Sequence, residues 1–260
     1  MLRLALIQMR AIAVNVWRAS VRDRILLILW ASALLCILFS LVLGKMTIGN
    51  EESVLQTAGF WVMGIWGLVS VLYLGSNIVR QEIYQKTIYF ILSRPVHRTS
   101  FLLGKFFGMI IVLASLFFIL ALCWLLLLLS KGVPLNAGHL IALAFIFGEW
   151  VLLASFSLFF AAFTSPLLHN FFLVGLSFLG HWSRDLYLFS ENAHSAIAKT
   201  LLSAIYHVLP NLDALNFRQA ALYNEPIDAG LLITAGAVLL AWMLTALVGA
   251  HLIFSRRRLL

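Results

Sequence analysis

Six long apolar runs constrain what this chain can fold into more than any motif does. Each has about 20 residues or more, the length that a helix needs to cross about 30 Å of bilayer hydrocarbon. The runs cover residues 25–44, 54–76, 103–129, 139–163, 166–186 and 229–254. The 260 residues are 63% hydrophobic and 11% charged, which is more apolar surface than a soluble domain of this length can bury. We therefore expect an all-α integral membrane protein, a single transmembrane domain (1–260) with six transmembrane helices.

The basic residues predict the orientation of these helices. Thirteen of the 18 Lys and Arg residues precede the first apolar run, lie between Arg80 and Lys105, or follow the last run. Because basic residues accumulate on the cytoplasmic side of a membrane, these three segments and both chain ends are expected in the cytoplasm. An even number of spans agrees with that placement. We expect a multi-pass protein of a bacterial plasma (inner) membrane.

The N-terminal segment has the pattern of an amphipathic helix. Between residues 2 and 18, apolar side chains repeat with the period of a helix, and Arg3, Arg10 and Arg18 fall on the opposite side. This pattern predicts an interfacial elbow helix over residues 1–22, lying on the cytoplasmic surface before the chain enters the bilayer. An N-terminal extension of the first span is the alternative.

Several classes of enzyme are excluded by the motifs that the sequence lacks. It has no phosphate loop of the G-x-x-x-x-G-K-[ST] type, no H-E-x-x-H and no G-x-S-x-G. Its two cysteines, Cys36 and Cys123, lie in apolar runs without the spacing of metal ligands. We therefore expect no enzyme activity, no catalytic residue, no metal site and no cofactor in this chain, and no nucleic-acid partner.

The segment 80–98 is the polar interruption most suited to contact a soluble partner. Residues 80–92 lack Gly and Pro and can form a short helix with Tyr84, Thr87 and Ile88 on one face. Pro95 ends that helix, because it biases Arg94 away from helical angles. A basic loop held to anionic lipid is the alternative interpretation.

The residues of this segment resemble a known family. They match the pattern R-x-E-x(4)-T, L-S-R-P-x-x-R and L-L-G-K that is typical of ABC type-2 transporter permeases, and in particular of multicopper-enzyme-maturation-type permease components. The matching residues are Arg80, Glu82, Thr87, Leu92, Ser93, Arg94, Pro95, Arg98, Leu103, Gly104 and Lys105. Lys86 departs from the pattern, which has Gly before the Thr.

The resemblance implies a permease subunit with an elbow helix, six transmembrane helices, a cytoplasmic coupling helix within 80–98, and outer re-entrant or interfacial helices within 186–228. Such a subunit pairs with a second copy, as a homodimer or with a close relative as a heterodimer, and binds two ATP-binding-cassette ATPase subunits. ATP and Mg would bind those subunits. The residues expected to dock the ATPase are Arg80, Glu82, Tyr84, Thr87, Ile88, Arg94, Pro95 and Arg98.

One carboxylate, Glu149, lies near the middle of a predicted span. An acidic side chain at that depth is costly and usually faces protein or water, so Glu149 is a candidate for the translocation path or its gate. The alternative is a structural hydrogen bond to Ser155, Ser157 or the backbone of another helix. A second candidate group closes the outer end of the fifth span: His181, Trp182, Arg184 and Asp185. An ordinary interfacial belt is the alternative for these four residues.

The cargo is predicted only by class. Spans rich in Phe and Leu favour export of a hydrophobic substrate, although membrane lipid would face the same composition. Two alternatives stay open: ATP-driven force transmission to a periplasmic partner through 186–228, and a membrane scaffold or assembly factor that transports nothing.

Overall fold

The computed structural model describes residues 2–47, 49–84, 98–192 and 195–256, and in this part of the chain it contains ten α-helices, one 3-10 turn and no strand. The all-α prediction is confirmed for these residues. The elements are α1 (Leu2–Val21), α2 (Arg24–Met46), α3 (Glu51–Tyr84), α5 (Arg98–Ser130), α6 (Ala137–Ala161), α7 (Pro166–His181), α8 (Ser183–Glu191), α9 (Ala196–Val208), η1 (Asp213–Leu215), α10 (Arg218–Tyr223) and α11 (Ala229–Arg256).

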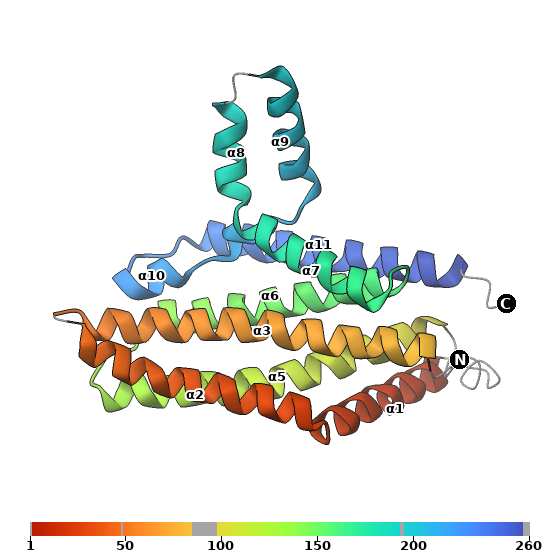
Figure 1. Cartoon of the computed structure of the whole chain (residues 1–260), viewed down its shortest axis with the longest axis horizontal. Coiled ribbons are helices and arrows are strands. Elements are labelled where there is room, and N and C mark those ends of the chain that lie inside the picture. Colours follow the sequence, from red (N-terminus) through yellow and green to blue (C-terminus); the bar gives the residue numbers. More distant parts are fainter. Residues whose placement is uncertain (1, 48, 85–97, 193–194, 257–260) are drawn as a thin grey trace.

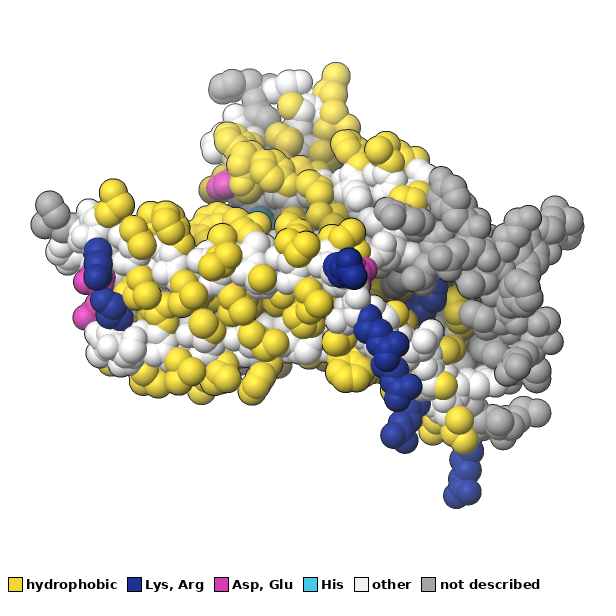
Figure 2. All heavy atoms as spheres, turned by 60° about the horizontal axis from the view of Figure 1, so that its bottom comes forward, with side chains coloured by type: hydrophobic (Ala, Val, Ile, Leu, Met, Phe, Trp, Pro, Cys, Tyr) yellow, Lys and Arg dark blue, Asp and Glu magenta, His cyan; other side chains and the backbone are white. Residues whose placement is uncertain are grey.

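Five of these helices are long and apolar enough to cross a membrane: α2, α3, α5, α6 and α11. They coincide with five of the six runs expected from the sequence. In Figure 2, hydrophobic side chains cover the long helices, and charged side chains gather at the two ends of this apolar band. The chain is therefore a multi-pass membrane protein by the length, composition and surface of its helices.

The run 166–186 does not form one long helix, which corrects the fifth predicted span. Helix α7 has 16 residues, which at 1.5 Å per residue gives about 24 Å. The chain turns at Trp182, and α8 begins at Ser183. The turn leaves Arg184 and Asp185 exposed, whereas a straight helix would carry both charges onward along the bundle. The Ser183 hydroxyl fixes the turn by donating a hydrogen bond of 2.7 Å to Asn211 Oδ1.

Local signals explain where several helices begin. Asp23 caps α2 by accepting a hydrogen bond of 2.9 Å from the backbone N–H of Ile25. Asn136 and His139 form a reciprocal capping box at the start of α6. Pro166 occupies the first turn of α7, where its missing N–H costs no hydrogen bond.

The long helices lie side by side, with α3 and α6 in the centre (Figure 1). Helix α3 contacts α2, α5, α6 and α7, and α6 contacts α3, α5, α7 and α11. In the most apolar window of α6, 61% of the residues are buried, against 11% in α11. Helix α11 is therefore peripheral within one chain and leaves most of its surface to lipid or to another protein.

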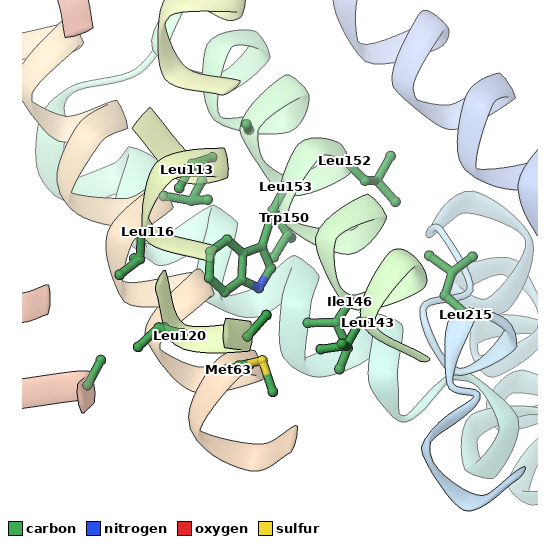
Figure 3. Close-up of a cluster of buried hydrophobic side chains, with 14 of the residues drawn as sticks. Met63, Leu113, Leu116, Leu120, Leu143, Ile146, Trp150, Leu152, Leu153 and Leu215 are labelled. Carbon is green, nitrogen blue, oxygen red and sulfur yellow. The ribbon is translucent and has the colours of Figure 1, made fainter. Parts of the chain in front are cut away.

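The core is built around the fully buried ring of Trp150 on α6 (Figure 3). Leu113 and Leu116 of α5, Met63 of α3 and Ile146 of α6 surround this ring. The indole passes so close to Gly67 of α3 that a β-carbon there would collide with it. Glycine at this position is therefore what lets α3 and α6 pack closely around a tryptophan.

The N-terminal helix α1 packs against the beginning of α5. A β-carbon at Gly104 would lie 2.8 Å from Ile12 Cβ, and one at Gly108 would lie 2.7 Å from Val16 Cβ. The Gly104-x-x-x-Gly108 spacing thus provides a smooth surface for a second helix. The predicted elbow is confirmed as a helix, and Figure 2 shows basic side chains along it.

Helices α8 and α9 form a hairpin that projects from the bundle, across the direction of the long helices (Figure 1). The rings of Tyr187 and Tyr206 join the two helices, with centroids 5.2 Å apart. Large apolar side chains such as Phe189 and Ile197 are 64% and 73% exposed. The described part of the segment 186–228 contains the helices α8, α9 and α10, and the hairpin leaves an apolar surface uncovered within the described chain.

Candidate functional site

A buried carboxylate with two basic partners is the most unusual polar group of the bundle. Glu149 lies in the middle of α6, and its side chain is only 7% exposed. Its Oε1 atom is 3.3 Å from Nε2 of His181, and its Oε2 atom is 3.6 Å from Nη2 of Arg218. Each carboxylate oxygen therefore faces a different basic side chain, one from α7 and one from α10.

Arg218 reaches Glu149 because of how α10 is placed. Helix α10 contacts α6 and α3, and the ring of the preceding Phe217 lies 4.5 Å from that of Phe145 on α6. The guanidinium also passes close to α3, where a β-carbon on Gly64 would lie 3.1 Å from its Nη2 atom. A short helix after the hairpin thus inserts a cation between the two central helices.

The contacts of His181 restrict where the protons of the His181–Glu149 pair can lie. Its Nδ1 atom lies 2.8 Å from the carbonyl oxygen of Ser177, which can only accept, so Nδ1 carries a hydrogen. A hydrogen bond between Nε2 and Glu149 then requires one proton in that contact, on the imidazole or on the carboxyl group. The two side chains consequently share a single proton site, in which the carboxylate is 7% and the imidazole 34% exposed.

This arrangement joins parts of the chain that are distant in sequence. Glu149 belongs to the central helix α6, whereas His181 ends α7 and Arg218 begins α10. Loss of the carboxylate charge would leave the Arg218 guanidinium, whose side chain is 19% exposed, without its counter-ion in this cluster. The cluster can therefore hold the segment after α7 against the bundle core. Among the residues that the structure describes, no group of His, Cys, Asp or Glu could hold a metal ion.

Two of the five residues predicted for a gate come together here, and three do not. Glu149 and His181 are in contact, whereas Trp182, Arg184 and Asp185 are exposed at the start of the hairpin. The ring of Trp182 packs on Phe178, with centroids 4.5 Å apart.

The structural alternative for Glu149 named the wrong partners. Ser155 donates to the carbonyl of Leu152, and the Ser157 hydroxyl lies 3.0 Å from His169 Nε2. Arg218 is the partner that the sequence does not reveal. A buried carboxylate requires a cation nearby, and Arg184 is closer to Glu149 along the sequence than Arg218 is. Arg218 is the partner because the chain turns at Trp182 and because of where α10 is placed.

The residues expected to dock an ATPase lie only partly in the described structure. Helix α3 continues to Tyr84, so the backbone of Arg80 and Glu82 belongs to its last turns and does not begin a separate helix. Thr87, Ile88, Arg94 and Pro95 lie outside the described residues.

Arg98 is the exception, because its side chain is described and engaged within the chain. It opens α5, and its Nη1 atom donates to the carbonyls of Phe254 at 3.3 Å and Ser255 at 2.7 Å. It therefore caps the C-terminal end of α11.

A search of this chain against models of known protein families and against curated proteins finds no match. The resemblance to ABC type-2 permeases accordingly depends on the residues between Arg80 and Lys105 and on the order of the helices.

Proposed function

We propose that this chain is the membrane-spanning permease subunit of an ATP-binding-cassette transporter, driven by separate ATPase subunits to export a hydrophobic substrate. The sequence between Arg80 and Lys105 supports this function through its resemblance to ABC type-2 permeases. Two ATPase subunits, with their ATP and Mg, and a second copy of the chain complete the proposed transporter.

The packing around the base of α5 is the observation that carries the proposal. Helix α1 lies on Gly104 and Gly108, and the end of α11 is held by Arg98, so both helices contact the first turns of α5. The segment 80–98 joins α3 to this same helix. A force applied to that segment would therefore act on α1, α3, α5 and α11 together, as coupling to an ATPase requires.

The Glu149 cluster has a defined role in this proposal. In this proposal a path opens where the central helices α3 and α6 separate from α7 and α10, which they contact in the structure. The contacts of Glu149 with His181 and Arg218 oppose that separation. We propose that these contacts hold the outer half of the path closed, and that they break and form again in each transport cycle.

Purification of this chain in mild detergent with whatever ATPase binds it, followed by an ATPase assay in lipid nanodiscs, tests the proposed function. Glu82→Lys reverses a charge in the segment that would dock the ATPase and should abolish its binding. Glu52→Lys, an exposed charge reversal at the opposite end of α3, is the matched control and should leave binding unchanged.

Two results would contradict the proposal. If Glu82→Lys retains full ATPase binding and transport, the segment 80–98 is not the coupling element. If mild-detergent purification recovers no ATPase at all, the scaffold interpretation replaces the transporter.

A further inference from the structure

An open groove of about 600 Å³ lies between α2, α3 and α7, on the outside of the bundle. Its apolar walls come from all three helices: Ile25 and Leu29 on α2, Val69 and Leu72 on α3, and Pro166 and Leu167 on α7. The groove lies near the beginnings of α2 and α7, so it opens toward the leaflet expected to be cytoplasmic. Its volume is within the range of about 300–1,000 Å³ that small-molecule sites occupy.

Polar side chains also line this groove. The Tyr73 hydroxyl donates a hydrogen bond of 2.6 Å to Asp23 Oδ2, and the Ser76 hydroxyl lies 2.6 Å from Asn170 Oδ1 and 2.7 Å from the carbonyl oxygen of Leu72. Asn77 also lines this end of the groove, so its wall offers several polar side chains among the apolar ones. Since polar groups that face hydrocarbon are costly, an occupant with oxygen atoms at this end would stabilise the groove.

Positive charge stands beside the groove. Arg22 and Arg24 are both exposed and flank Asp23, which contacts Tyr73 in the wall. Both oxygens of Asp23 are engaged, one by the backbone N–H of Ile25 and one by Tyr73, so the carboxylate is held in place. The three residues together leave an excess of one positive charge, and Figure 2 shows basic side chains where α1 meets α2.

We propose that this groove binds one anionic phospholipid, with an acyl chain along the apolar walls and the phosphate near Arg22 and Arg24. The apolar walls, the polar side chains at one end of the groove and the adjacent positive charge match the acyl chain, the ester-linked glycerol and the phosphate of such a lipid. The site requires only that the chain is inserted in a membrane. It does not depend on an ATPase partner or on transport, so its test is independent of the proposed function.

Native mass spectrometry of the full chain tests this site. The delipidated protein is loaded with phosphatidylglycerol or with phosphatidylcholine of the same acyl chains, and bound lipid is counted. We expect one phosphatidylglycerol to be retained in preference to phosphatidylcholine. Arg22→Gln and Arg24→Gln should each weaken its binding about fivefold, as expected for one basic residue near an anionic headgroup.

Val69→Phe should block the groove and abolish retention of the lipid. Leu167→Trp, at a position that is 80% exposed, provides a second block with little risk to folding. The matched controls are Leu35→Phe on the exposed side of α2 and Arg10→Gln on α1, and both should retain the lipid. Equal retention of the two lipids, or undiminished retention by folded Val69→Phe and Leu167→Trp, would overturn the proposal.

Discussion

The Oε2 atom of Glu149 lies 3.6 Å from Nη2 of Arg218, joining the middle of α6 to the first residue of α10. Removal of one partner from a buried ion pair typically costs about 3–5 kcal/mol, because the other charge stays buried without compensation. Glu149→Gln should therefore lower stability by a few kcal/mol, to be measured as the thermal midpoint in a fixed detergent. Glu52→Gln, at an exposed position, should change it little.

The same pair predicts non-additivity. Because Arg218→Met removes the cation that Glu149→Gln would leave unpaired, the double variant should be more stable than the sum of the two single losses predicts. A double-mutant cycle measures this coupling, which for groups in contact is about 0.5–3 kcal/mol. Additive losses would mean that the two side chains do not interact in the membrane.

Gly108→Leu should displace α1 from α5. A β-carbon at this position would lie 3.1 Å from the backbone carbonyl of Ala13, which cannot move aside like a flexible side chain. Disulfide cross-linking between cysteines placed in α1 and α5 should fall sharply in this variant. Gly175→Leu is the matched control, since a β-carbon added there would meet nothing within 4 Å, and it should leave the cross-link intact.

Gly67→Ala should destabilise the core, because the added methyl group collides with the buried indole of Trp150. Overpacking of this kind costs about 1–3 kcal/mol. Combining Gly67→Ala with Trp150→Leu should recover part of the loss caused by the alanine, because the smaller side chain makes room. We expect a lower unfolding temperature for Gly67→Ala than for the wild type. When Trp150→Leu is already present, adding Gly67→Ala should lower the unfolding temperature by less than it does in the wild type.

The ion pair of Lys131 with Glu51 should contribute little. The Nζ and Oε1 atoms lie 2.8 Å apart, but the side chains are 30% and 40% exposed. Pairs in such surroundings are typically worth about 0–1 kcal/mol. Lys131→Ala should therefore leave the thermal midpoint nearly unchanged, and a large loss would indicate that this end of the bundle is less hydrated than its exposure suggests.

The long helices are predictable from the sequence because bilayer thickness imposes a length that apolar runs must meet. The run 166–186 shows the limit of that argument, because hydropathy counts apolar residues but does not register the turn at Trp182. Glu149 is predictable as a candidate because a carboxylate in a span is rare. Its pairing with Arg218 is not, since that contact depends on how α10 folds back onto α6 and α3.

Two helices from opposite parts of the sequence meet on the first turns of α5. Helix α1 lies against Gly104, and Ser255 of α11 accepts a hydrogen bond from Arg98. During synthesis α1 emerges before α5 does, whereas α11 emerges after it. The contact of α5 with α1 can therefore form as soon as α5 is made, whereas its contact with α11 must wait until α11 has followed.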